Sequence, residues 1–126
     1  MEDFTSIQKQ AIYNISTLMM SADGRISAKE ADYWRKIATL LGMTETEKLS
    51  SMSMNHSEAI NALRSMSASC KIIAIKIFAE MMLVDGNVDK KEKQLLDNLY
   101  DSIGVEQAAI LLNGINLRNL VAPYNP

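Results

Sequence analysis

Four acidic residues have the types and the spacing to do chemistry in this sequence. Asp23 and Glu30 lie around one Asp-Gly turn, and Asp85 and Glu92 lie with the same spacing around a second. Carboxylate oxygens are the ligands that hard divalent cations prefer. If the fold brings the two turns together, these carboxylates form a weak site for Ca²⁺, Mg²⁺ or Mn²⁺, with Asp89 as a further candidate ligand. No other cofactor is predicted.

Each turn matches the second half of an EF-hand calcium loop, in which an aspartate, a glycine, a β-branched residue and a final glutamate follow in step. A complete loop also needs oxygen ligands at its first and third positions. Those positions fall on Met19 and Ser21 in the first copy and on Met81 and Leu83 in the second. A standard EF-hand is therefore excluded, and a site shared by the two turns remains.

A purely structural interpretation of the turns competes with the metal site. Ser27 with Glu30, and Asp89 with Glu92, have the spacing of capping boxes, in which cap and glutamate satisfy each other's backbone N–H groups. Ile26 precedes the first cap and is expected to pack under its helix as a hydrophobic staple. The glycines of the turns supply backbone conformations that a Cβ would penalise. The sequence therefore allows either a metal site or purely structural caps at the two turns.

The two turns belong to a longer internal similarity. When the sequence is shifted by 62 residues without a gap, residues 12–43 align with residues 74–105. The identical pairs are Ile15/Ile77, Met19/Met81, Met20/Met82, Asp23/Asp85, Gly24/Gly86, Lys29/Lys91, Glu30/Glu92 and Gly42/Gly104. The alignment predicts a duplicated helix–turn–helix unit whose two copies pack on each other.

Apolar residues recur three and four positions apart along the chain, which indicates an all-α fold. The two prolines, Pro123 and Pro126, lie at the C-terminal end, so residues 1–122 are expected to form one domain and 123–126 a flexible tail. The predicted helices cover residues 5–22, 27–41, 44–52, 55–66, 69–84 and 89–103, with short ones near 107–112 and 116–121. Gly42 and Gly104 are expected to end two of them.

Composition excludes several classes of function. The chain has 13 basic and 15 acidic residues and a net charge of -2, whereas a nucleic-acid-binding protein carries a basic face. A single Cys excludes an internal disulfide, and one Cys with one His cannot build a structural zinc site. The most apolar stretch, 72–84, is too short to span a bilayer. The N-terminus lacks the pattern of a secretory signal, so a cytoplasmic location is expected.

The remaining reactive side chains do not suggest an enzyme. His56 is expected to be an ordinary loop residue, because catalysis needs a histidine with an orienting partner. Cys70 is expected to be a buried and inert thiol. Nucleophile elbows, phosphate-binding glycine loops and zinc-binding helices are not found in the sequence.

Methionine is unusually frequent, with nine residues in the chain. Those shared by the two copies are expected to fill the core. Four others surround the short middle helices, namely Met43, Met52, Met54 and Met66. They are expected to fill the core as well, and the alternative is an adaptable apolar groove for a partner helix.

The two turns with their flanking helices resemble the TerB-like domain of bacterial tellurite-resistance proteins. Asp-Gly-[Arg/Asn]-[Ile/Val]-x-x-x-Glu follows a helix ending Met-Met-x-[Ala/Val] and precedes one ending Leu-Leu-Gly-Met or Ser-Ile-Gly-Val. The N-terminal domain of DjlA-type co-chaperones belongs to the same group. The match covers about residues 8–121, and it lacks the membrane helix and the J domain of those co-chaperones.

The resemblance implies a single bundle of about seven helices with an internal duplication. It also implies a cytoplasmic, non-enzymatic binding or adaptor role in a stress-response assembly, with divalent metal at Asp23, Glu30, Asp85 and Glu92. The expected partner is a protein, with peripheral association to a membrane complex as an option. The alternative is a co-chaperone-like interaction module with a Met-rich groove and no metal.

Overall fold

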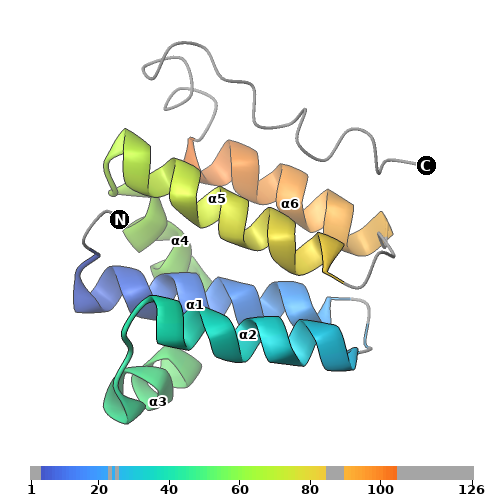
Figure 1. Ribbon diagram of the computed structural model, residues 1–126. Coiled ribbons are helices and arrows are strands. Elements are labelled where there is room, and N and C mark those ends of the chain that lie inside the picture. Colours follow the sequence, from blue (N-terminus) through green and yellow to red (C-terminus); the bar gives the residue numbers. More distant parts are fainter. Residues whose placement is uncertain (1–3, 23, 25, 85–89, 105–126) are drawn as a thin grey trace.

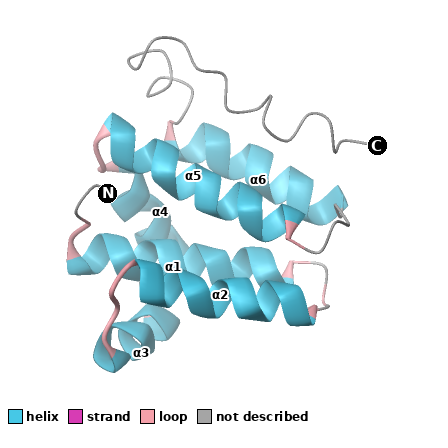
Figure 2. Ribbon diagram, viewed as in Figure 1, coloured by secondary structure: helices cyan, strands magenta, loops and turns pink. Residues whose placement is uncertain are grey.

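The computed structural model describes residues 4–22, 24, 26–84 and 90–104. Within these residues the regular structure is helical and no strand occurs (Figure 2). The helices are α1 (Ser6–Ser21), α2 (Ala28–Leu40), α3 (Glu45–Ser53), α4 (His56–Arg64), α5 (Ala68–Leu83) and α6 (Lys90–Ile103). The all-α prediction is confirmed. The short helices predicted near 107–112 and 116–121, and the tail 123–126, lie outside the described residues.

Side-chain caps explain where the helices begin. The Ser27 hydroxyl accepts the N–H of Glu30 at 3.1 Å, and the Glu30 carboxylate accepts the N–H of Ser27 at 3.0 Å. Thr44 and Glu47 form the same reciprocal pair at α3. The box at Ser27 was predicted above, and both boxes satisfy backbone donors that the first turn of a helix leaves open.

The cap of α4 differs in one hydrogen bond from the capping boxes of α2 and α3. The Asn55 side-chain oxygen accepts the N–H of Glu58 at 2.8 Å. The Glu58 carboxylate accepts a hydrogen bond from the Asn55 side-chain amide. An asparagine side chain carries an NH₂ donor beside its acceptor oxygen. Here the oxygen caps the helix and the NH₂ group donates to Glu58.

The helices pack as two hairpins with α3 and α4 alongside (Figure 1). The α1–α2 hairpin lies against the α5–α6 hairpin, while α1 also packs on α3 and α4. Ile15 and Met19 of α1 are fully buried, and Ile77 and Met81 of α5 are 4% and 0% exposed. Helix α5 is buried on two faces, because it packs against α1, α2, α4 and α6.

Glycines in the left-handed conformation end two helices. Gly42 follows α2 with a φ of 64°, and Gly104 follows α6 with a φ of 81°. An L side chain is strained at such angles, so glycine is the residue that allows the chain to leave the helix there. Both helix ends were predicted from the sequence.

The staple predicted at Ile26 is wrong, because 56% of this residue is exposed. The first turn of α2 directs Glu30 inward, where it is 3% exposed, and the core contacts of the helix come later, at Ile37 and Ala38. An inward glutamate at the start of the helix leaves the preceding apolar residue on the solvent side.

None of the helices within the described residues is both long and apolar enough to cross a membrane.

Candidate functional site

Glu30 and Glu92, two of the four predicted metal ligands, are nearly fully buried, with exposed fractions of 3% and 2%. They lie in the first turns of α2 and α6, which Figure 1 places at the same end of the bundle. The other two, Asp23 and Asp85, lie outside the described residues, as does Asp89. Among the described residues, no group of three or more His, Cys, Asp or Glu side chains is placed to hold a metal ion.

A pocket of about 410 Å³ lies between α1, α3 and the start of α4. Its lining combines apolar side chains with hydrogen-bonding groups, as ligand sites commonly do. The lining residues are Asn14, Thr17, Leu18, Ser21, Ser51, Met52, Met54, Asn55 and His56. We call this the α1/α3/α4 pocket.

Asn14 joins α1 to the end of α3 by hydrogen bonds beside the α1/α3/α4 pocket. Its side chain is buried, and its Nδ2 donates to the carbonyl oxygens of Ser51 at 3.0 Å and Met54 at 2.7 Å. Ser51, fully buried, donates its hydroxyl to the Gln10 carbonyl oxygen at 2.7 Å. These three bonds attach the end of α3 and the turn after it to α1, and they satisfy polar groups that burial would otherwise penalise.

His56 is oriented by the same asparagine. The His56 Nδ1 lies 3.0 Å from Asn14 Oδ1. Because Asn14 Nδ2 faces two carbonyl oxygens, its Oδ1 must be the atom toward the imidazole, and Nδ1 must carry the proton. In the neutral ring, Nε2 then presents a lone pair as an acceptor or a ligand.

The prediction placed His56 in a loop, and this placement is wrong, whereas its being neither a base nor a metal ligand stays a prediction. His56 is the first residue of α4, and its orienting partner comes from α1, 42 residues away. No local motif links the two residues, so reading the sequence locally missed the pair. One signal was available: Asn14 interrupts the apolar face of α1 between Ala11 and Leu18, and a polar residue in such a place needs partners.

The Thr17 and Ser21 hydroxyl groups of this pocket donate their protons to carbonyl oxygens of α1. Thr17 donates to the Tyr13 carbonyl oxygen at 2.8 Å and accepts the indole N–H of Trp34 at 2.9 Å. Ser21 donates to the Thr17 carbonyl oxygen at 3.0 Å. The rings of Tyr13 and Trp34 stack with centroids 5.0 Å apart, which fixes α2 against α1 behind the pocket.

The four middle methionines divide between core and surface. Met66 is buried, and Met43 packs against the core, in agreement with the predicted core filling. Met52 is 67% exposed and Met54 is half-buried, and both line the α1/α3/α4 pocket. Met54 packs against the core as Met43 does, so core filling describes Met43, Met54 and Met66, while Met52 lies exposed beside the pocket.

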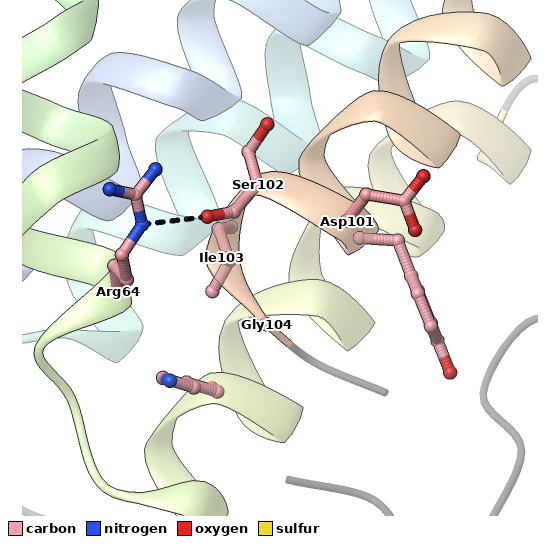
Figure 3. A pocket seen from close by; sticks show the side chains of 7 residues that line it. Arg64, Asp101, Ser102, Ile103 and Gly104 are labelled. Atoms are coloured by element: carbon pink, nitrogen blue, oxygen red, sulfur yellow. Dashed lines mark hydrogen bonds between the residues drawn. The ribbon is translucent and has the colours of Figure 1, made fainter. Parts of the chain in front are cut away.

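A second pocket, of about 340 Å³, lies at the C-terminal end of α6 (Figure 3). Arg64 donates its Nε–H to the Ser102 carbonyl oxygen at 2.9 Å, and Lys71 also lines the pocket. Basic side chains at a helix C-terminus satisfy its last carbonyl groups and the negative end of its dipole. This role in ending α6 accounts for Arg64.

A third pocket, of about 510 Å³, lies between α2 and α5. There the Tyr33 hydroxyl donates to the Glu80 carboxylate. Burial, and then the hydrogen bond and negative charge of Glu80, raise the pKa of Tyr33 well above its ordinary value. Tyr33 is therefore a neutral donor that joins the two hairpins.

Comparison with known proteins identifies the fold and no function. No family model matches the chain, and no curated protein matches it. A similar solved structure is that of a protein of unknown function, PG1108, from Porphyromonas gingivalis W83. The two share 21% sequence identity with a TM-score of 0.68, over 91% of this chain and 100% of the other. This chain therefore has the fold of that bacterial protein.

Proposed function

We propose that this protein is a non-enzymatic binding module that takes a segment of a partner protein at the α1/α3/α4 pocket. Its place in a cytoplasmic stress-response assembly rests on the TerB-like sequence resemblance. The observation that carries the binding role is the outer face of α3. Leu49 and Met52 lie one turn apart on this short helix, and they are 68% and 67% exposed.

Two large apolar side chains three positions apart lie on the same face of a helix. Single exposed apolar residues are ordinary on a protein surface, whereas neighbouring ones beside a cavity are typical of interaction sites. Met52 lies on the exposed face of α3 and also lines the α1/α3/α4 pocket. The flexible and polarisable methionine side chain adapts to differently shaped apolar partners.

The pocket also offers a directional contact. His56 Nε2 accepts a hydrogen bond in the neutral tautomer that Asn14 holds. Leu18 and Met54 supply apolar walls. The partner that fits is a peptide segment carrying an apolar side chain for the pocket and an N–H or O–H donor for His56.

Binding accounts for this geometry better than catalysis does. The hydroxyl protons of Thr17 and Ser21 are donated to helix carbonyl oxygens. Nucleophilic catalysis instead requires a hydroxyl that gives its proton to a base such as His56.

Leu49→Glu tests the proposed surface. The substitution is expected to leave the fold intact, because Leu49 is exposed, and to lower partner binding at least about tenfold, since a charge opposes desolvation of an apolar interface. Tagged protein would be recovered from its source cells, and the amount of co-purifying partner compared with wild type.

Lys76→Glu is the control, because Lys76 is exposed on α5 and its substitution makes the surface charge more negative by two, where Leu49→Glu makes it more negative by one. The proposal is contradicted if L49E retains the partner at the wild-type level, or if K76E loses the same partner to the same extent.

We further propose that α1–α2 and α5–α6 are two copies of one unit, within a bundle of about seven helices. Aligned positions of the two copies have matching burial: Met19 and Met81 are each 0% exposed, and Glu30 and Glu92 are 3% and 2% exposed. In the second candidate function, these two glutamates hold a divalent cation together with Asp23 and Asp85. The burial of a carboxylate at the same position of each copy favours it, because buried charges are paired or coordinate metals.

A thermal-unfolding series with Ca²⁺, Mg²⁺ and Mn²⁺ against chelator tests the cation site. A cation at one hundred times its Kd stabilises by about 2.7 kcal/mol, which raises the midpoint by several degrees. The double substitution of Asp23→Asn and Asp85→Asn is expected to abolish that rise, since it removes two anionic ligands and leaves Glu30 and Glu92 in place. A shift that survives this substitution, or no shift with any cation, contradicts the site.

A further inference from the structure

Two thioethers and an oriented imidazole line the same pocket. Met52, Met54 and His56 occupy alternate positions of the segment Met-Ser-Met-Asn-His and all line the α1/α3/α4 pocket. Their donor atoms are sulfur, sulfur and nitrogen, so the group differs in chemistry from the carboxylates of the two acidic turns.

The connection between α3 and α4 runs along the pocket. Met54 ends α3 with φ -72° and ψ 132°, and Asn55 follows with φ -79° and ψ 159°. Both conformations are extended and close to polyproline II, and they carry the chain from α3 to α4 along the pocket. Met54 and His56 both line the pocket, while Asn55 uses its side chain to cap α4. Met52 reaches the pocket from the last turn of α3.

The hydrogen bond between His56 Nδ1 and Asn14 orients the imidazole so that Nε2 is available to bind a metal. Histidines that bind metals almost always donate their other ring N–H to an oxygen acceptor, which fixes the tautomer and the ring orientation. Asn14 Oδ1 supplies this acceptor at 3.0 Å from Nδ1. Asn14 is itself fixed, because its Nδ2 donates to the Ser51 and Met54 carbonyl oxygens. The same asparagine therefore anchors both the imidazole and the backbone of one thioether ligand.

We propose that Met52, Met54 and His56 bind one Cu(I) ion. Thioether ligands are soft and select Cu(I), and imidazole also suits copper, whereas Ca²⁺ and Mg²⁺ require oxygen donors. The three ligands are neutral, so the bound ion keeps a single positive charge, which the solvent at the pocket mouth can stabilise. Met52 is 67% exposed, which gives the ion a route of entry. This inference does not depend on the proposed partner protein.

The test is an anaerobic Cu(I) titration of the full chain in competition with the chelator bicinchoninate. We expect one ion per chain. Met54→Leu and His56→Gln are each expected to weaken Cu(I) affinity by more than about tenfold, since removing even an outer contact of a metal ligand lowers affinity about 10- to 100-fold. Far-UV circular dichroism and the unfolding midpoint establish that each variant is folded.

Two control variants separate this site from other sulfur ligands. Met43→Leu changes a methionine outside the pocket, and Cys70→Ala removes the thiol, which is buried on α5. Both are expected to keep the wild-type affinity. Leu49→Glu is also expected to keep it, because it leaves all three ligands in place, so this variant separates loss of partner docking from loss of the copper site, which share Met52 and His56. The proposal is overturned if wild type binds Cu(I) no more tightly than M54L and H56Q, or if C70A alone abolishes binding.

Discussion

Replacing Asn14 with leucine is expected to lower the free energy of unfolding by about 2–4 kcal/mol, because each lost hydrogen bond contributes about 1 kcal/mol and an orphaned buried acceptor costs about 1–3 kcal/mol. The change removes the bonds to the Ser51 and Met54 carbonyl oxygens and to His56 at almost constant side-chain volume. Ser51 keeps a backbone bond from the Met54 N–H, so the Met54 carbonyl oxygen bears most of the loss. Urea unfolding of both proteins measures the difference.

His56→Gln is the informative comparison for the Asn14 substitution. It removes only the bond between the imidazole and Asn14, at an exposed position, and is expected to cost about 1 kcal/mol or less. Amide hydrogen exchange should also increase over residues 51–56 in N14L, because this segment loses its attachment to α1. Equal losses in N14L and H56Q would contradict the role of Asn14 as the anchor of the pocket.

Phe78→Ala is expected to have the largest effect on stability, a loss of about 3–5 kcal/mol, because it opens a cavity that the surrounding side chains cannot fully refill. Phe78 is 0% exposed and is among the largest fully buried side chains. It lies on α5, the helix that contacts both members of the α1–α2 hairpin as well as α4 and α6. Urea unfolding again gives the value.

The matched control for Phe78 is Leu49→Ala, a truncation on an exposed helix face. It is expected to change stability by no more than about 0.5 kcal/mol. If F78A were no more destabilising than L49A, α5 would not be the central helix of the core.

Much of the fold could be predicted because its determinants are local. The capping boxes at Ser27 and Thr44 each need two residues three positions apart, and the glycine that ends α2 needs only its own conformation. The burial of Met19 and Met81 also followed from helical periodicity within each helix. Each of these features depends only on residues within one or two turns of the same helix.

The pocket could not be predicted because it depends on contacts between distant segments. Asn14 and His56 are 42 positions apart, and only the packing of α1 against α3 and α4 brings them together. The same packing decides that Met66 is buried while Met52 is exposed, although both are methionines of the short middle helices. Periodicity identifies an apolar face but does not say which neighbour covers it.

The acidic turns illustrate how one residue can satisfy two interpretations. Glu30 forms the predicted capping box and is also 3% exposed, so its carboxylate has a structural role and lies away from bulk solvent. Capping accounts for the bond to the Ser27 N–H without any metal. The chelator series with the doubly substituted Asp23 and Asp85 distinguishes a cap alone from a cap that also serves as a ligand.

The central claim is that the protein binds its partner at the surface formed by α3 and the α1/α3/α4 pocket. Site-specific photo-crosslinking in the source cells tests it most directly, with a benzophenone side chain placed at position 49 in one experiment and at position 76 in another. Both positions are exposed, on α3 and α5 respectively. The account predicts a discrete crosslinked partner at position 49 and none at position 76. A partner captured at position 76 and not at position 49 would contradict it.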